Sequence, residues 1–219
     1  MNEIGINVYD EFIPTHSLDL HGWMANIEIF ENLITKQKPS VIIEVGTWKG
    51  RSAITMANVV KKLNLNCKIY CIDTWLGALE FWNNDQTSDK DLFLKYGYPQ
   101  IYYQFLSNVI HTNNQDIIIP VPLPSNIAWK LLLNKNIKSS LIYIDASHET
   151  DDVYNDITNY SKLLTFDGIM FGDDYTWYTV KDGVHKFVKE NNCEKAMRYE
   201  FSPNPEAGPI NWIYENINI

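Results

Sequence analysis

Four side chains able to hold a cation or move a proton follow two apolar runs in the second half of the chain. Asp145 and His148 end the predicted strand SLIYIDASH, and Asp173 and Asp174 end the predicted strand GIMFGDDY. Neighbouring strands of a sheet lie about 4.8 Å apart, so these carboxylates cannot all stay ionised without compensation. Either a pKa rises or a cation binds, and oxygen ligands favour a hard divalent ion, Mg²⁺ first and Mn²⁺ or Ca²⁺ as substitutes.

The same acids allow an interpretation without a metal. Asp173 and Asp174 would then be solvated loop residues, and Asp145 would cap a helix. Spacing alone leaves these two interpretations open. Thr150 is the candidate N-cap of the next predicted helix. Asp151 and Asp152 fall in the first turn of that helix, where the helix dipole already favours negative charge. We expect a structural role for them.

His148 is the candidate general base. It lies past a strand end, three residues after Asp145, and a histidine with a reference pKa near 6.5 can accept a proton at neutral pH. A single histidine is more often a surface or core residue. The remaining histidines have no comparable neighbours in the pattern: His16, His21, His111 and His185.

The stretch VIIEVGTWKGRSAITMA, residues 41–57, reads as an apolar strand, a turn bounded by two glycines and a helix. Turns of this kind hold nucleotide cofactors in open α/β sheets. In a dinucleotide fingerprint, the second glycine lets the backbone approach a pyrophosphate. Trp48 stands at that position between Gly46 and Gly50, so the turn disfavours a pyrophosphate.

Asp73 ends the next predicted strand and suits the hydroxyls of a ribose. A nucleoside with a ribose and no pyrophosphate is expected here, and S-adenosylmethionine (SAM) fits that description. Its amino-acid end needs backbone donors and a nearby acid, which the turn and Glu44 supply. An NAD(P)-dependent oxidoreductase that uses Asp73 for a ribose is the alternative, and Trp48 argues against it.

The elements that would position these residues alternate along the chain, which predicts an α/β fold with a Rossmann-like, doubly wound, mostly parallel sheet and helices on both faces. In such sheets the ligand lies beyond the carboxyl ends of the strands. Seven strands are expected, the last two as an antiparallel hairpin: 40–46, 68–75, 116–122, 140–148, 168–175, 195–202 and 210–217. Helices are expected at 51–63, 100–112, 125–133, 150–164 and 182–191.

Two further segments have no partner in this alternation. An N-terminal helical extension, residues 1–39, contains an apolar stripe over 21–37 made of Trp23, Ile27, Phe30 and Ile34. The polar and aromatic stretch 77–97 is long for a connection, which suggests a lid or a disordered excursion.

The quoted segments resemble the class I SAM-dependent methyltransferases, specifically the metal-dependent small-molecule O-methyltransferases related to the catechol and macrolide-sugar enzymes. EVGTWKGRS is similar to the first motif of that group, CIDTW to the second, YIDASHETDDVYNDI to the fourth and GIMFGDDY to the fifth. The resemblance covers roughly residues 40–190, and the motifs occur in the family's order. It implies a SAM-dependent methyltransferase domain over 40–219.

The resemblance also implies residue roles. The methionine end of SAM would be framed by Gly46, Trp48, Gly50 and Ser52 with help from Glu44, the ribose bound by Asp73, and the adenine edged by Ser125 and Asn126. Asp145, Asp173 and Asp174 match the family's metal positions. Catechol enzymes have a lysine where this chain has His148, whereas the macrolide-sugar type has a histidine, so an aromatic diol acceptor is disfavoured.

These roles together imply an O-methyl transfer. A divalent cation would bind an acceptor hydroxyl and lower its pKa, His148 would remove the proton, and the oxygen would attack the methyl group of SAM in line. The acceptor would be a small molecule such as a sugar, a polyketide-type product or another diol. A non-catalytic SAM-binding protein is a further alternative, against which the complete set of acids and His148 argues.

Bulk composition limits the partners. The 219 residues have a formal net charge of −9, with no concentration of Lys or Arg, which argues against nucleic acid and anionic membranes. The N-terminus lacks the pattern of a signal peptide, and no apolar run approaches the roughly 20 residues of a membrane span. A cytoplasmic protein is expected, with a homodimer as a fair guess.

Overall fold

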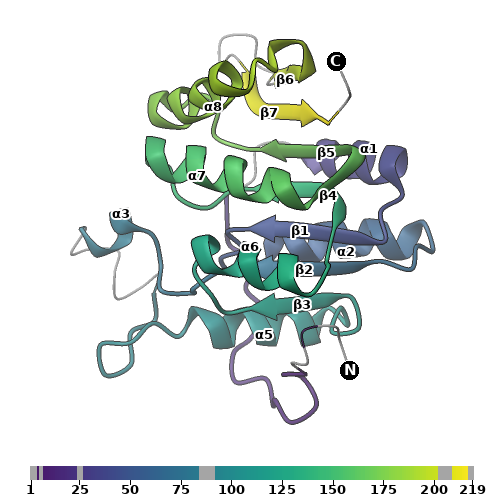
Figure 1. The fold of residues 1–219 in the computed structure, drawn as a ribbon. Coiled ribbons are helices and arrows are strands. Elements are labelled where there is room, and N and C mark those ends of the chain that lie inside the picture. The colour runs from purple at the N-terminus through teal and green to yellow at the C-terminus, as the bar shows by residue number, and fades with distance from the viewer. Residues whose placement is uncertain (1–3, 5–6, 24–26, 84–91, 202–208, 217–219) are drawn as a thin grey trace.

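A seven-stranded sheet forms the centre of the computed structural model, within a chain described at residues 4, 7–23, 27–83, 92–201 and 209–216. The strand order is β3-β2-β1-β4-β5-β7-β6, and helices cover both faces (Figure 1). The strands are β1 (Val41–Val45), β2 (Lys68–Ile72), β3 (Ile118–Val121), β4 (Ser139–Ile144), β5 (Leu164–Gly172), β6 (Met197–Phe201) and β7 (Pro209–Glu215).

The first five strands are parallel, and β7 runs antiparallel to both β5 and β6. The expected doubly wound sheet and its C-terminal antiparallel hairpin are therefore confirmed. The hairpin enters the sheet through its second strand, so that β7 lies between β5 and β6. This insertion places β7 beside the strand that leads to Asp173 and Asp174.

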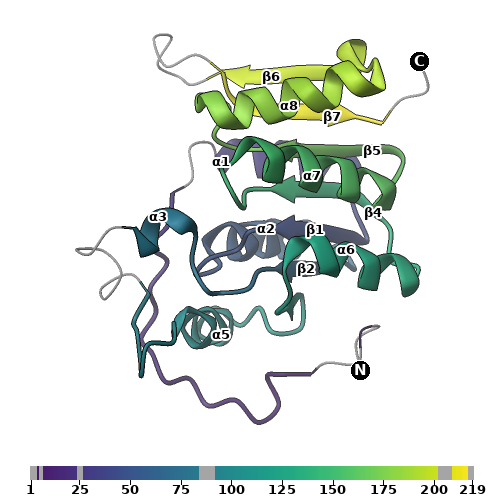
Figure 2. The same cartoon turned by 60° about the vertical axis from the view of Figure 1, so that its left-hand side comes forward.

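Helices form one layer on each side of the sheet. In Figures 1 and 2 one face is covered by α6, α7 and α8, and the other by α1, α2 and α5. The helices are α1 (Ile27–Gln37), α2 (Arg51–Lys62), α3 (Leu79–Trp82), α5 (Ile101–His111), α6 (Ser125–Asn134), α7 (Thr150–Tyr160) and α8 (Tyr178–Asn191), with 3₁₀ turns at Ser161–Leu163 and Glu194–Ala196.

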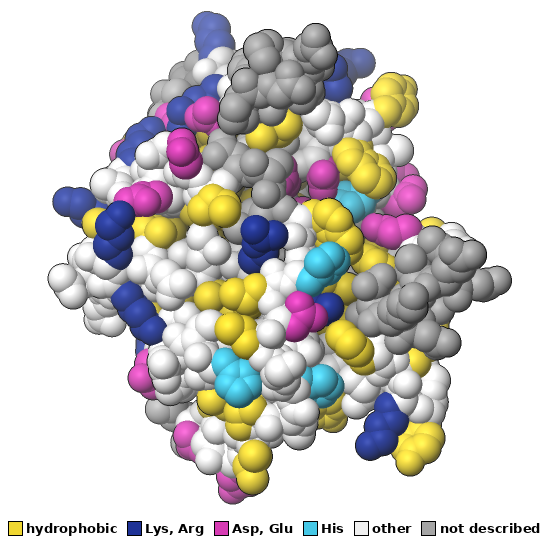
Figure 3. Space-filling model, turned by 180° about the vertical axis from the view of Figure 1, so that it is seen from behind, with side chains coloured by type: hydrophobic (Ala, Val, Ile, Leu, Met, Phe, Trp, Pro, Cys, Tyr) yellow, Lys and Arg dark blue, Asp and Glu magenta, His cyan; other side chains and the backbone are white. Residues whose placement is uncertain are grey.

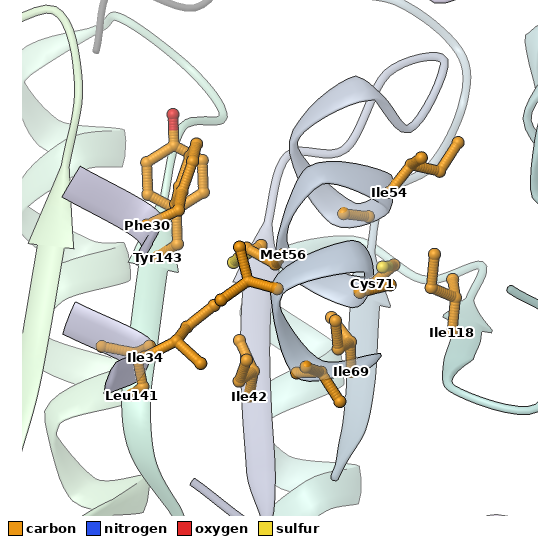
Figure 4. Close-up of a cluster of buried hydrophobic side chains, with 14 of the residues drawn as sticks. Phe30, Ile34, Ile42, Ile54, Met56, Ile69, Cys71, Ile118, Leu141 and Tyr143 are labelled. Carbon is orange, nitrogen blue, oxygen red and sulfur yellow. The ribbon is translucent and has the colours of Figure 1, made fainter. Parts of the chain in front are cut away.

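Side chains of alternate strand residues enter two separate cores because successive residues of a strand point to opposite faces. Ile42 packs with the α1, α2 and α5 layer, whereas Ile43 packs with the α6, α7 and α8 layer. Figure 4 shows part of the first core, in which Phe30 of α1 lies against Tyr143 of β4, at a ring separation of 5.1 Å. These two layers hold the strand ends in fixed register.

The N-terminal helix begins later than the pattern predicts. Phe30 and Ile34 are buried as expected, but the helix starts at Ile27, which is half exposed, and Trp23 is 66% exposed outside it. The predicted stripe over 21–37 was therefore wrong at its first two members. Trp23 belongs instead to an extended segment, residues 7–23, that reaches the glycine turn.

A second correction concerns the start of α7. Thr150 is the first residue of this helix rather than its N-cap, which is Glu149. The Thr150 hydroxyl donates a hydrogen bond to the carbonyl of Thr179 at 3.1 Å, so it joins the start of α7 to α8 rather than capping its own helix.

The carboxyl ends of the parallel strands lie at one edge of the sheet, and α3 lies beyond that edge (Figures 1 and 2). Part of the connection predicted at 77–97 is thus the short helix α3, and residues 84–91 lie outside the described chain. Within the described chain, no helix has the length and apolar character needed to cross a membrane.

Candidate active site

The turn after β1 has a backbone that only particular residues allow. Gly46 and Gly50 adopt positive φ angles of 84° and 88°. A side chain at Gly46 would place its Cβ 2.0 Å from the carbonyl oxygen of Asp145, and one at Gly50 would meet the ring of Phe105 at 2.8 Å. The two glycines therefore let the turn pack closely against β4 and α5.

Trp48 occupies the turn with an unusual left-handed backbone, φ 50°. Its ring is stacked on Phe81 of α3, with 4.7 Å between centroids and an interplanar angle of 15°. Trp23 packs against both rings at 6.3 and 6.0 Å. Aromatic side chains from three chain segments therefore cover the turn where a pyrophosphate would lie in a dinucleotide site.

Asp73 holds the turn through backbone hydrogen bonds. Its Oδ2 accepts from the amides of Thr47 and Trp48, both at 2.9 Å, and its Oδ1 accepts from the amide of Trp75 at 2.7 Å. Burial raises the pKa of Asp73, and these hydrogen bonds act in the opposite direction. A carboxylate has about four acceptor positions, so the turn uses most of this side chain before any ribose is bound.

Glu44 is fully buried on β1 beneath the same turn. It accepts hydrogen bonds from the hydroxyls of Ser52 and Thr47, and the thiol of Cys71 lies 3.4 Å from its Oε2. Burial raises the pKa of Glu44 to about 8. The side chain is thus a protonatable group enclosed by partners, close to the start of α2.

Ser125 and Asn126 open α6, after β3. Ser125 is half-buried and hydrogen-bonds the carboxyl of Asp156 on α7, and its carbonyl accepts from the hydroxyl of Tyr160 at 3.1 Å. Asn126 is exposed. Both residues follow β3, which pairs in parallel with β2. They therefore lie at the same end of the sheet as Asp73, which follows β2.

Two of the three acids expected at the ends of β4 and β5, Asp145 and Asp174, come together with His148, and the third, Asp173, lies outside this group. Asp145, His148 and Asp174 each offer one ligand atom, and these atoms lie within 4.8 Å of one another. A small cavity of about 10 Å³, with room for one water molecule, lies at this point and has an apolar wall that includes Trp212 of β7. Its other lining residues are Ile144, Ala146, Ser147, Val153, Asp173 and Val180.

The two aspartates of β4 and β5 are fixed by different neighbours. Asp145 Oδ2 accepts a hydrogen bond from the hydroxyl of Tyr143 at 2.8 Å. Asp173 is buried, and its Oδ1 accepts from the side-chain amide of Asn211 at 3.2 Å and from the backbone amide of Asp174 at 2.9 Å. Asp173 therefore lines the pocket but stands outside the three-residue group.

Electrostatic repulsion is strong at this edge. Burial, and then the charges of Asp173 and Asp174, raise the pKa of Asp145 to about 7. His148 Nε2 lies 3.0 Å from Asp174 Oδ2, and this contact raises the pKa of the ring. The carboxylates thus favour a positive charge in their midst, either a protonated His148 or a cation.

Several residues of the site had no signal in the sequence. Lys49 is 3% exposed and pairs with Asp19 of the N-terminal segment, at 2.8 Å from Nζ to Oδ2. Asn108 on α5 donates to the carbonyls of both Asp19 and Lys49, at 2.6 and 2.8 Å. For Asn211, the only hint in the sequence is that it is a polar residue within the apolar strand INWIYENI.

The fold and the site together define a class of protein. A mostly parallel seven-stranded sheet with an antiparallel last pair, a glycine turn after β1, an acid after β2 and acids after β4 and β5 is the arrangement of a class I methyltransferase. The sequence profile of the family described as "Methyltransferase domain" matches residues 43–175. The chain belongs to this family, and the resemblance stated from the motifs is confirmed.

Solved O-methyltransferases share the fold at low sequence identity. One from Bacillus cereus, in complex with SAH, matches with a TM-score of 0.60 and 15% identity over 88% of this chain and 80% of that one. NovP matches at 0.59 and 13%, over 88% and 79%. TomG from Streptomyces achromogenes, involved in tomaymycin synthesis and in complex with SAM, matches at 0.57 and 13%, over 91% and 83%. No curated protein sequence matches the chain.

Proposed function

We propose that this methyltransferase transfers the methyl group of SAM to a hydroxyl of a small molecule. A divalent cation, preferably Mg²⁺, would bind at the ends of β4 and β5. The observation that supports this most directly is the convergence of Asp145, His148 and Asp174 beside a pocket. The structural neighbours named above are O-methyltransferases, and two of them hold SAM or its product SAH.

The turn after β1 suits SAM better than a dinucleotide. Asp73 already accepts hydrogen bonds from the amides of Thr47 and Trp48, which a pyrophosphate bound in the turn would need as donors. The Trp48 ring, stacked on Phe81, covers the turn. Gly46, Trp48, Gly50 and Ser52, with Glu44, would frame the methionine end. Asp73 would bind a ribose hydroxyl with its remaining acceptor capacity, and Ser125 and Asn126 would edge the adenine.

The donor set at the other edge fits a hard divalent cation. Asp145 and Asp174 would hold it, with His148 adjacent and Asp173 as the third carboxylate. Burial and the neighbouring charges of Asp173 and Asp174 raise the pKa of Asp145 to about 7, and a cation bound here would offset that repulsion. When bound, the cation would lower the pKa of an acceptor hydroxyl.

The chain's own residues would then orient the acceptor and take its proton. His148 Nε2 faces the acids and would accept the proton, while Trp177 packs on the ring at 4.6 Å. The apolar wall of the pocket would exclude water on the α7 and α8 side. Alignment of the acceptor oxygen with the methyl group matters most, because well-oriented pairs gain effective molarities of about 10⁵ M or more.

The surroundings favour a small, uncharged acceptor over a macromolecule. On the face formed by α1, α2 and α5, Figure 3 shows Lys and Arg side chains spread among acidic and apolar ones, without a continuous basic surface on the described part of that face. The acids around the pocket would repel a phosphate or carboxylate. A sugar, a polyketide-type product or another diol meets these conditions.

Calorimetric titration of SAM into the purified protein, with Mg²⁺ and again with EDTA, tests the proposal. We expect micromolar SAM binding in both conditions and a separate heat of Mg²⁺ binding that is lost in Asp174→Ala. Absence of SAM binding in both conditions would contradict the proposal, and NADH would be the next ligand titrated.

A further inference from the structure

A buried polar side chain on β7 reaches the acids at the end of β5. Asn211 is 2% exposed, and its side-chain amide nitrogen donates hydrogen bonds to two acceptors there. The nitrogen lies 3.2 Å from the carbonyl oxygen of Gly172 and 3.2 Å from Oδ1 of Asp173. Because an amide nitrogen carries two N–H donors, these two hydrogen bonds use its full donor capacity.

The pairing of β5 with β7 explains why these residues meet. Gly172 is paired with Trp212 in the antiparallel register. The residue after Gly172 is Asp173 and the residue before Trp212 is Asn211, so these two stand opposite each other where the strands end. Opposite residues of an antiparallel pair have Cβ atoms roughly 4.5–5.5 Å apart. The strand register itself therefore brings the amide to Asp173.

The orientation of the amide follows from its neighbours. Gly172 offers a carbonyl oxygen and Asp173 a carboxylate oxygen, and both are acceptors, so the amide nitrogen must face them. The amide oxygen of Asn211 then has no hydrogen-bond partner among the described residues. A buried polar atom without a partner lowers stability. This cost indicates that the donors of Asn211 have a use that an apolar side chain of the same size would not supply.

We propose that Asn211 is a positioning residue of the cation site: its amide fixes the carboxylate of Asp173 beside Asp145 and Asp174 and thereby raises the affinity for Mg²⁺. This inference rests on the cation proposed above. Oδ1 of Asp173 also accepts from the backbone amide of Asp174 at 2.9 Å, so donors from two segments hold one carboxylate oxygen. Groups that orient metal-binding side chains in this way typically contribute about 10–100-fold to metal affinity.

Close packing around Gly172 makes the frame of this contact rigid. A Cβ atom at Gly172 would lie 2.5 Å from the ring of Trp212 and 2.6 Å from the carbonyl oxygen of Ile144. The strands β4 and β7 therefore approach β5 closely at the residue before Asp173. In such a frame, loss of the amide should free the carboxylate of Asp173 rather than move the strand.

Asn216 provides a matched control at the opposite end of β5. Its side-chain amide donates to the carbonyl of Thr165 at 2.9 Å, and its backbone pairs with Gly168 and Asp167. It therefore makes the same kind of hydrogen bond to β5 as Asn211 does, but away from the acids. Both asparagines help to hold the sheet together, whereas contact with Asp173 distinguishes Asn211.

Calorimetric titration of Mg²⁺ into the wild type, Asn211→Leu and Asn216→Leu tests the inference without an acceptor. We expect the Kd for Mg²⁺ to rise about 10–100-fold in Asn211→Leu and to stay that of the wild type in Asn216→Leu. Both variants should melt at a lower temperature than the wild type, because each loses a hydrogen bond to β5. Their affinity for SAM should be unchanged, since both amides contact β5 rather than the turn after β1.

Two further measurements separate positioning from misfolding. Asn211→Ala removes the amide without adding atoms, so it should show the same loss of Mg²⁺ affinity if the leucine fits poorly. With Mn²⁺ as a substitute, the electron paramagnetic resonance spectrum of the bound ion should differ from that of the wild type in Asn211→Ala. The spectrum of Asn216→Leu should equal that of the wild type.

An unchanged Kd for Mg²⁺ in both Asn211 variants would overturn the role of Asn211 and leave the methyltransferase proposal intact. An equal loss of Mg²⁺ affinity in Asn216→Leu would also overturn it, because the loss would then come from weakened strand pairing. Failure of the wild type to bind Mg²⁺ while it binds SAM would overturn the cation and this inference together, but not methyl transfer from SAM.

Discussion

Carboxylates in two parts of the site have opposite surroundings. In the turn after β1, Asp73 accepts three backbone hydrogen bonds and Glu44 is enclosed by two hydroxyls and a thiol. At the ends of β4 and β5, Asp145 faces Asp173 and Asp174, and its pKa is raised to about 7. In the first region hydroxyl, thiol and backbone donors surround the acids, whereas in the second the acids repel one another and favour a protonated His148 or a cation.

This difference suggests that the two regions have separate roles, one in binding SAM and the other in catalysis. A region whose donors and acceptors are satisfied can hold its shape before a ligand arrives, which favours binding. A region with crowded, uncompensated acids gains most from a bound cation. We therefore expect changes at the acids to affect catalysis far more than folding, and changes under the turn to affect stability and SAM affinity.

The largest effect is expected from Asp145→Asn. Loss of this charge should abolish the heat of Mg²⁺ binding and lower methyl transfer by about 10²-fold or more, because a bound cation supplies several kcal/mol of charge stabilisation. Calorimetry and a methyl-transfer assay measure the two losses. Asp151→Asn, which removes an exposed acid paired with Lys186 at 3.0 Å, should change neither. Full Mg²⁺ binding in Asp145→Asn would remove the distinction between the two regions.

The next largest effect is expected from His148→Ala, which should lower turnover by about 10²–10⁴-fold. Its affinity for SAM should stay that of the wild type, because His148 contacts Asp174 and Glu80 rather than the turn. Single-turnover kinetics together with SAM titration would measure both quantities. Unchanged turnover in this variant would mean that the ring is not the base.

A smaller and different effect is expected from Asp73→Asn. An asparagine retains one acceptor oxygen, so at least one of the three amides of Thr47, Trp48 and Trp75 loses its partner. We expect about 1–3 kcal/mol lower stability and weaker SAM binding, by denaturant unfolding and calorimetry. Asp116→Asn, at an exposed acid, serves as the control. Strong loss of Mg²⁺ binding alone would contradict the assignment of Asp73 to the turn.

The last comparison concerns the pH dependence of stability, part of which Glu44→Gln should remove. Because the pKa of buried Glu44 is raised to about 8 from 4.5, the unfolded chain loses this proton at lower pH than the folded chain. The wild type should therefore lose stability as pH rises from about 4.5 to 8, by up to about 1.4 kcal/mol per pH unit. Below that window the two proteins should have equal pH dependence.

Melting curves of Glu44→Gln and the wild type across this window measure the difference directly. Asp145 also has a raised pKa, but it is present in both proteins, so their difference isolates Glu44. Parallel curves from pH 5 to pH 8 would show that Glu44 is ionised in the folded state.

Local patterns were sufficient for the order of elements and for the residues at strand ends. The alternation of apolar strands with amphipathic helices predicted the parallel sheet, and a parallel sheet necessarily brings Asp145 and Asp174 to one edge. Patterns failed where a residue's surroundings come from distant segments. Trp23 was predicted inside a helical stripe, and Thr150 as a cap, because periodicity and composition say nothing of long-range contacts.

The sequence by itself determined the fold class, the strand that bears each candidate acid, and the glycines at positions where a side chain would collide with β4 or α5. Only the tertiary structure decided which acids share one centre: Asp145, Asp174 and His148 meet, whereas Asp173 turns to Asn211. It also placed Glu80 at His148 and Asp19 at Lys49. The physical reason is that the order of strands and helices along the chain follows from local periodicity, whereas side-chain pairing depends on contacts between segments far apart in the chain.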